Sequence, residues 1–295
     1  MLTFFILNGL SDNPQLQVPI FFLVLLIYLI SLGGNMSILL LVCLDPQLNT
    51  PMYFFLCNLS VVNISSTTVT VHRILVIFVT GDNVVSFMTA WHRCISLDGY
   101  FFGWLCGNEL ILLTIMSYDR FVAICKPFHY STVMNCRVCA GLAIFCWSFS
   151  LLQILPAMGI FSRFSCYVSN EINHFFCYLV GLMKLSCSDT SILELLMFTQ
   201  GGLLSTFTPF LLTFISYSFI IATRMRMKTS TGRSKAFYTC SSHLTVVTLY
   251  YASLVCQYLT PISTTKSSKF LSLLNTAVIP KLNPFIYSLK NKIKM

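Results

Sequence analysis

The chain has 295 residues, of which 56% are hydrophobic and only 9% are charged. A water-soluble domain carries about 25% charged residues, so this composition excludes a soluble globular protein and predicts that lipid surrounds most of the chain. The net charge of +9 comes without any nucleic-acid-binding motif, and it therefore predicts membrane topology and contact with anionic lipid.

Stretches without charge show where the chain can cross a membrane, because a spanning helix needs about 20 mostly apolar residues. Five such stretches are free of Asp, Glu, Lys and Arg, and two further ones are apolar but carry a few polar residues. In chain order the predicted spans are 18–43, 53–79, 93–122, 137–158, 193–224, 234–260 and 267–290. They predict one domain over residues 1–295, an all-α membrane protein built as a seven-helix bundle.

The basic residues orient this bundle. If the N-terminus lies outside and the C-terminus inside, eleven of the 18 Lys and Arg residues fall in inner segments, and five of these lie between Arg224 and Lys235. The other seven lie outside or near outer helix ends. This distribution agrees with the positive-inside rule.

Four cysteines are expected at the outer side, where the oxidising environment permits disulfides. They are Cys94, near the outer end of the third span, and Cys166, Cys177 and Cys187, between the fourth and fifth spans. Four cysteines allow three pairings, and their spacing does not choose among them.

Several motifs follow one another in order along the spans. They are Gly34-Asn35, Pro51–Leu56 (PMYFFL) with Leu59-Ser60, Met116–Cys125 (MSYDRFVAIC), Ser216-Tyr217, Lys235–His243 (KAFYTCSSH) and Pro280–Leu289 (PKLNPFIYSL). Over nearly the whole chain this set resembles the rhodopsin-like G-protein-coupled receptors and, within them, the vertebrate olfactory receptors.

The resemblance implies a multi-pass odorant receptor of the plasma membrane, without enzymatic activity or cofactor. It would bind a small, mostly apolar ligand and activate a stimulatory, olfactory-type G protein to raise cyclic AMP. The five His residues show no metal-ligand spacing and no nucleophile motif is present, which also argues against an enzyme.

Three alternatives stay open beside this interpretation. A non-olfactory chemosensory receptor would have the same sequence features. A degenerate copy that does not signal is another, since no Asn-x-Ser/Thr sequon precedes the first span. A transporter or channel is disfavoured, because the chain shows neither paired inverted repeats nor a pore-lining filter.

The resemblance places activation and G-protein coupling at the inner ends of the helices. The residues are Asp119, Arg120, Tyr217, Lys235, Asn283, Pro284 and Tyr287. An Arg within a span is costly unless it is paired or reaches water. The resemblance implies that Asp119 holds Arg120 at rest, and Phe121 follows where the family has Tyr. Pro284 breaks the seventh helix. The alternatives are an Arg120 that only anchors the helix at the interface and a static kink at Pro284.

The ligand is expected between the outer halves of helices three, five, six and seven. Counting from Arg120 predicts as its lining Phe102, Gly103, Cys106, Gly107, Gly202, Ser205, Tyr251, Val255 and Tyr258. The glycines of helix three would leave room, and the tyrosines would orient the ligand through their hydroxyls. Ordinary helix packing is the alternative for each of these residues.

Two further expectations come from the resemblance. It implies a sodium pocket between Glu109 and an acid of the second helix, but Asn63 occupies that second position, so at most a weak site is expected. A protonated, hydrogen-bonded Glu109 is the alternative. The resemblance also implies the disulfides Cys166–Cys187 and Cys94–Cys177, with Cys94 one residue away from the usual place.

Overall fold

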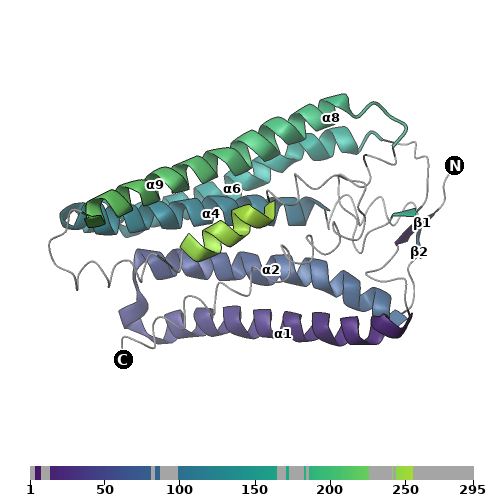
Figure 1. Cartoon of the computed structure of the whole chain (residues 1–295), viewed down its shortest axis with the longest axis horizontal. Helices are drawn as coiled ribbons and strands as arrows, with labels where there is room; N and C mark the ends of the chain where they lie inside the picture. Colours follow the sequence, from purple (N-terminus) through teal and green to yellow (C-terminus); the bar gives the residue numbers. More distant parts are fainter. Residues whose placement is uncertain are drawn as a thin grey trace.

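The structure is a computed structural model that describes residues 4–7, 14–80, 84–86, 99–164, 171–172, 183, 186–225, 241 and 244–254. It is an elongated bundle of helices that run roughly side by side (Figure 1). The long helices are α1 (Pro14–Leu44), α2 (Pro51–Thr80), α4 (Tyr100–Cys125) and α6 (Cys136–Phe161). A further continuous helical run comprises α8 (Ser191–Leu196), the π-helical η4 (Met197–Phe207) and α9 (Thr208–Met225), and residues 244–254 form a shorter helix.

Five of the described helices are long and apolar enough to cross a membrane. They are Gln17–Leu44, Pro51–Val71, Tyr100–Cys125, Cys136–Phe161 and Ser191–Thr223, and the shorter apolar helix is Leu244–Leu254. At about 1.5 Å per residue, the 26 residues of α4 exceed the roughly 30 Å of a bilayer core. Each helix overlaps one predicted span, and the seventh predicted span, 267–290, lies outside the described residues.

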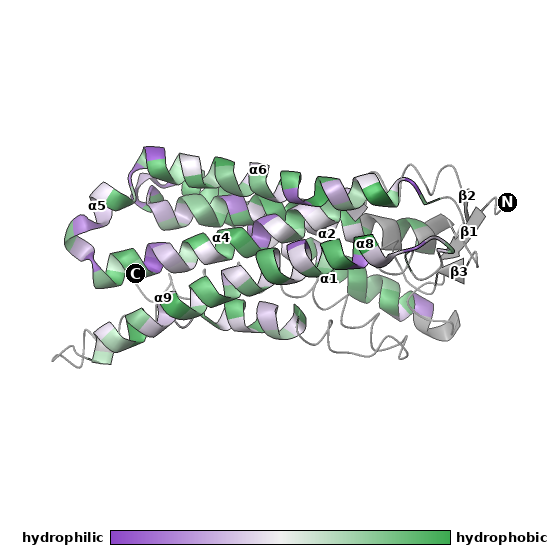
Figure 2. Cartoon of the chain, turned by 90° about the horizontal axis from the view of Figure 1, so that it is seen from above, coloured by the Kyte–Doolittle hydropathy of each residue, from purple (hydrophilic) through white to green (hydrophobic). Residues whose placement is uncertain are grey.

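The outer faces of these helices are apolar, as lipid requires. Hydrophobic residues run along the helices in Figure 2, and Phe22, Ile144 and Phe214 are among the large apolar side chains that are exposed. Buried residues are instead a mixture of apolar and polar, including Asn35, Asn63 and Glu109. A bundle in lipid places polar groups inside because hydrocarbon cannot hydrogen-bond them.

Short elements join the helices at their two ends. At the inner end, the 3₁₀ turns η1 (Pro46–Leu48) and η3 (Pro127–His129) and the short helix α5 (Tyr130–Val133) follow α1 and α4. The helix α6 begins at Cys136 because the side chain of Asn135 accepts a hydrogen bond from the backbone N–H of Val138, at 3.0 Å.

A small sheet that the sequence analysis does not anticipate lies at the other end, near the N-terminus (Figure 1). Its strands are β1 (Phe4–Leu7), β2 (Val84–Ser86) and β3 (Glu171–Ile172), in the order β2-β1-β3. The central strand β1 is antiparallel to β2 and parallel to β3. Strands of two to four residues are too short to show a periodic pattern in the sequence.

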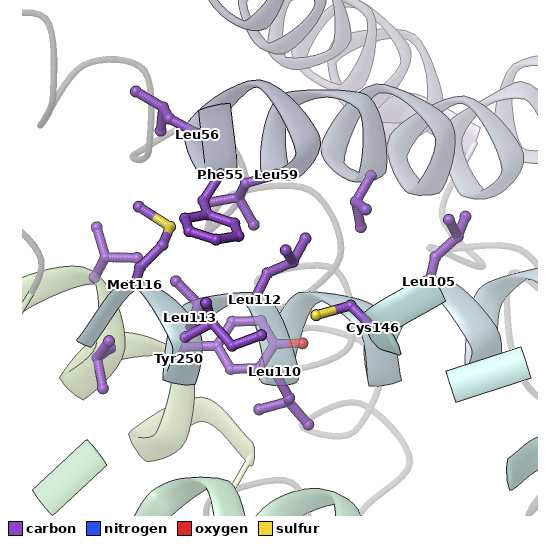
Figure 3. Close-up of a cluster of buried hydrophobic side chains, with 14 of the residues drawn as sticks. Phe55, Leu56, Leu59, Leu105, Leu110, Leu112, Leu113, Met116, Cys146 and Tyr250 are labelled. Atoms are coloured by element: carbon purple, nitrogen blue, oxygen red, sulfur yellow. The ribbon is translucent and has the colours of Figure 1, made fainter. Parts of the chain in front are cut away.

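The largest buried cluster lies where α2, α4, α6 and the helix 244–254 meet. Figure 3 shows its central side chains, among them Phe55 and Leu59 of α2, Leu112 of α4, Cys146 of α6 and Tyr250. Among the described residues, α1 adds Ile38 to this cluster, whereas the run from α8 to α9 adds no buried member. The helix α4 therefore lies at the centre of the bundle.

Two glycines bring α4 and α6 close together. A Cβ atom on Gly103 would overlap Cδ1 of Ile154, and a Cβ atom on Gly107 would lie 3.4 Å from Cβ of Ser150. Small residues four apart let helix backbones approach in a membrane, where packing replaces the hydrophobic effect as the driving force. Gly103 and Gly107 thus form a seam with α6.

Hydrogen bonds between tryptophans and an amide extend this seam to α2. Trp104 Nε1 donates to the backbone oxygen of Trp147 at 3.0 Å, and the two indole rings meet edge to face with centroids 5.4 Å apart. Trp147 Nε1 donates in turn to Oδ1 of Asn58 at 3.1 Å. Each buried indole N–H is satisfied by a neighbouring helix, which ties α2, α4 and α6 into one unit.

A substitution at the seam should destabilise the bundle. We expect Gly103→Leu to lower the free energy of unfolding by about 1–3 kcal/mol, since the added side chain must displace Ile154 from a filled space. The measurement is the thermal unfolding midpoint of the purified protein in detergent. Gly141→Leu is the control, because nothing lies within 4 Å of the Cβ position of Gly141, which is exposed. Equal midpoints for the two variants would contradict the seam.

Candidate functional site

The inner end of α4 carries a buried acid that is held by a tyrosine. Asp119 is 1% exposed, and Tyr130 of α5 donates its hydroxyl to Oδ1 of Asp119 at 2.9 Å. Burial and the Asp119 carboxylate raise the pKa of the Tyr130 hydroxyl, so the hydroxyl stays protonated and acts as donor. The resemblance implies Arg120 as the partner of Asp119, but the hydrogen bond in the structure comes from Tyr130, while the half-buried Arg120 contributes its charge nearby.

A second inner cluster joins α4 to α9 and to the helix 244–254. Tyr217 and Ile220 of α9 are buried against Phe121 and Ile124 of α4 and against Leu244. Tyr217 therefore lies at the contact of the three helices whose inner ends the sequence analysis associates with coupling. Four other predicted coupling residues, Lys235, Asn283, Pro284 and Tyr287, lie outside the described residues.

Between these clusters, the turn η3 presents an aromatic side chain to the surroundings. Phe128 follows Pro127 and is 95% exposed. Its neighbours Lys126 and His129 are exposed as well. Aromatic side chains of this kind can act as anchors when a partner protein buries them. The sequence analysis missed Phe128 and Tyr130, although an aromatic pair beside a proline just after the MSYDRFVAIC motif was visible.

In the middle of the bundle, a carboxyl, a thiol and a phenol come together. The hydroxyl of Tyr250 interacts with both the Glu109 carboxyl and the Cys106 thiol. Glu109 is 3% exposed, and its Oε1 has no hydrogen-bond partner in the part of the chain that the structure describes. Tyr250 belongs to the central apolar cluster, together with Leu110 and Leu113 (Figure 3).

One turn closer to the inner end, hydroxyl groups link α4 with α9. Thr213 Oγ1 lies 3.5 Å from both Thr114 Oγ1 and Ser117 Oγ. The hydroxyl of the buried Tyr251 lies close to the hydroxyls of Thr114 and Thr213. It makes no hydrogen bond of normal length and angle within the described residues. Its ring meets Phe210 of α9 edge to face at 5.1 Å. The interior thus offers a few polar groups in an apolar enclosure, which is the usual composition of a small-molecule site.

The structure separates the ligand residues that the sequence analysis groups together. Cys106 and Tyr251 face this interior, and Gly202 and Ser205 are half-buried in η4. Val255 and Tyr258 lie outside the described residues.

Three other predicted ligand residues contact neighbouring helices, and their place in a ligand site stays a prediction. Gly103 and Gly107 do not leave room in a pocket but allow α6 to approach. Phe102 packs with Val24 of α1 and Val71 of α2. The physical reason is that each residue turns a helix by about 100°, so residues at the right height can still point to another neighbour.

Asn63 of α2 lies beside Asn35 of α1 in the bundle interior. Its Nδ2 donates to Oδ1 of Asn35 at 3.3 Å, whereas Glu109 interacts with Tyr250. Among the described residues, no group of three or more His, Cys, Asp or Glu side chains could hold a metal ion.

The outer cysteines are described only in part. Cys187 is disulfide-bonded, while the other seven described cysteines are free. Its partner is therefore one of the cysteines outside the described residues, where Cys94, Cys166 and Cys177 also lie. The two pairings implied by the resemblance stay predictions.

Comparison with known proteins gives one consistent result. Residues 24–294 match the family model described as olfactory receptor. Human olfactory receptor 2AP1 is 43% identical over 295 residues, covering 99% of this chain and 93% of the relative. Mouse olfactory receptor 5AR1 is 42% identical over 294 residues, with coverages of 99% and 93%. The crystal structure of squid rhodopsin matches with a TM-score of 0.70 at 18% identity, over 94% of this chain and 78% of that chain, which shows a seven-helix receptor fold.

Loss of the Tyr130 hydroxyl should weaken the inner end of the bundle. We expect Tyr130→Phe to lower the free energy of unfolding by about 1–3 kcal/mol, because Asp119 is then buried without this donor. Thermal unfolding of the purified protein measures the effect. Tyr118→Phe, at a side chain that is 43% exposed, is the control and should change little. A Tyr130→Phe midpoint equal to that of the control would show that the bond does not stabilise the fold.

Proposed function

The chain belongs to the olfactory receptor family, and we propose that it binds a small, mostly apolar odorant inside its helix bundle and activates a stimulatory, olfactory-type G protein to raise cyclic AMP. As a member of this family it is a multi-pass receptor of the plasma membrane and not an enzyme. The observation that carries the proposal is the course of α4. One continuous helix lines the polar interior at Cys106 and Glu109 and ends at the inner cluster around Asp119.

The composition of the interior supports a neutral, mostly apolar ligand. The central cluster includes Leu110 and Leu113, and the polar groups of the interior are the Cys106 thiol, the Glu109 carboxyl and tyrosine hydroxyls. The Tyr250 hydroxyl interacts with both the Glu109 carboxyl and the Cys106 thiol, so these three polar groups lie together in the interior. A ligand would be oriented through the Tyr251 hydroxyl, which is buried and lacks a partner among the described residues.

The inner end supports the proposed G-protein contact. Phe128 is one of the large apolar side chains exposed at this end, together with Leu44 and Met225, and Lys126, His129 and Arg137 are exposed as well. The Tyr130–Asp119 bond fixes the segment that carries Phe128 to the end of α4. A rearrangement of α4 would therefore move the proposed docking residue together with Asp119 and Arg120.

The experiment that tests the function is a surface-expression assay combined with a cyclic-AMP readout against a broad odorant panel. Arg120→Ala is measured beside the unaltered chain at matched surface level. We expect an odorant-evoked signal that is lost in the variant. Good surface display without any signal, for a panel that activates a reference receptor, would contradict the proposed coupling.

Phe128 should act as an anchor for the G protein. We expect Phe128→Ala to lower the potency of an activating odorant by about tenfold or more, since a buried aromatic anchor at an interface contributes at least about 2 kcal/mol. The measurement is the concentration dependence of cyclic AMP at matched surface level. Val138→Ala, at another exposed apolar side chain, serves as control. Equal potency for both variants would remove Phe128 from the interface.

A further inference from the structure

We propose that Tyr250 is a positioning residue that holds the helix 244–254 against α4, and that losing this contact raises the signal of the receptor in the absence of a ligand. We call the interaction of the Tyr250 hydroxyl with Glu109 and Cys106 the Tyr250 contact. The effect on the signal rests on the proposed function, whereas the position of the helix can be tested without a ligand or a G protein.

The Tyr250 contact joins two helices in the middle of the bundle. Cys106 and Glu109 are three residues apart on α4, so they lie on the same side of that helix. Tyr250 comes from the helix 244–254 and is 2% exposed, and Glu109 is 3% exposed. An unpaired polar group in such an interior is costly, so the contact is favourable as long as the two helices stay together.

This polar contact fixes the helix 244–254 more strongly than its apolar side chains do. Val246 and Val247 are buried in the central cluster, but an apolar side chain is about as stable in lipid as in the bundle. The Glu109 carboxyl has no such alternative, because hydrocarbon offers no hydrogen bond. Its Oε1 atom already lacks a partner among the described residues. Removing the Tyr250 hydroxyl would therefore weaken the preference of the helix for its packed position.

The same helix reaches the cluster at the inner end of the bundle. Leu244 packs there with Tyr217 of α9 and Phe121 of α4. It lies six residues before Tyr250, which is about 9 Å along the helix. Phe121 follows Arg120, which the proposed function assigns to coupling. A displacement of the helix at Tyr250 would therefore loosen the packing next to Arg120.

Cys106 is the part of the contact that a ligand can reach. It is half-buried, whereas Tyr250 and Glu109 are buried. A phenol hydroxyl donates one hydrogen and also accepts, and a thiol is a weak donor. When the thiol donates to the phenol and the phenol donates to the carboxyl, the three groups form a chain in which each hydrogen bond strengthens the next. A ligand that binds the Cys106 thiol would then weaken the bond between Tyr250 and Glu109.

The position of the helix is tested by hydrogen–deuterium exchange of the purified full-length receptor in detergent, without a ligand. We expect Tyr250→Phe to speed up the exchange of the backbone amides of residues 244–254 by about threefold, the factor by which one interhelical hydrogen bond in a membrane protein shifts an equilibrium. Tyr28→Phe is the matched control. The Tyr28 hydroxyl lies 3.3 Å from Thr68 Oγ1 and joins α1 to α2, so its loss should leave exchange in 244–254 unchanged. Equal exchange in the two variants would overturn the proposal.

A second variant shows whether the effect depends on Glu109. In the background of Glu109→Leu, Tyr250→Phe should add little to the exchange rate, because the carboxyl that the hydroxyl binds is already absent. Independent, additive effects of the two substitutions would overturn the contact. Faster exchange in every helix, α1 and α2 included, would show general destabilisation and would overturn the proposal as well.

Basal signalling tests the consequence for the receptor. At matched surface level and without odorant, Tyr250→Phe should raise cyclic AMP by about threefold over the unaltered chain, and adding Arg120→Ala should abolish the rise. Tyr28→Phe should leave the basal level unchanged. A purely structural role would lower surface display without raising the basal signal. Loss of display in Tyr250→Phe but not in Tyr28→Phe would therefore overturn the proposal.

The two measurements together separate this proposal from the proposed function. Faster exchange with an unchanged basal signal, in a receptor that answers odorants, would overturn the role of Tyr250 in signalling. Faster exchange in a receptor that raises cyclic AMP for no odorant would support the position of the helix and count against the proposed function.

Discussion

The close packing of α4 against its neighbours is the constraint on which the rest of the structure depends. Gly103 and Gly107 let α6 approach, Trp104 and Trp147 carry the contact on to Asn58 of α2, and Thr114 and Ser117 reach Thr213 of α9. An apolar side chain gains little free energy when it moves from lipid into the bundle, because lipid is equally apolar. Close packing and hydrogen bonds between helices therefore replace the hydrophobic effect as the driving force. The position of α4 therefore decides which of its side chains point into the bundle and which meet another helix.

The same helix connects the two parts of the proposed mechanism. At mid-height it brings Cys106 and Glu109 to Tyr250, and at its inner end it holds Asp119 under the hydroxyl of Tyr130. Both arrangements pair a polar group of α4 with a tyrosine of another segment. Because an unpaired polar group in a low-dielectric interior is costly, each pair fixes one segment to α4. A ligand that shifts the upper pair and a G protein that binds beside the lower pair would act on one rigid element.

The fifth span shows a different use of backbone geometry. It combines α-helical geometry with the π-helical run Met197–Phe207, whose half-buried residues include Gly202 and Ser205. No residue type in this segment predicts a π-helix, because Gly, Leu, Ser and Thr also occur in α-helices. The hydrogen bond from Gln153 to the Gln200 oxygen depends on the packing of α6 beside η4, which the sequence does not contain. In the same way, the position of α5 next to the end of α4 decides that Tyr130 binds Asp119 and that Phe128 is exposed.

The sequence by itself determined the class, the family and the location of the membrane helices, because a charge in hydrocarbon is so costly that charge-free stretches mark the spans. The motif MSYDRFVAIC also predicted Asp119 and Arg120 at an inner helix end, and counting along the helices predicted Cys106 and Tyr251 as ligand residues. What the sequence could not decide is the direction in which a residue at a known height points. Phe102, Gly103 and Gly107 were at the expected height but face α1, α2 or α6. Height follows from counting residues along one helix, whereas direction depends on how several helices rotate and pack together, and only the tertiary structure contains that information.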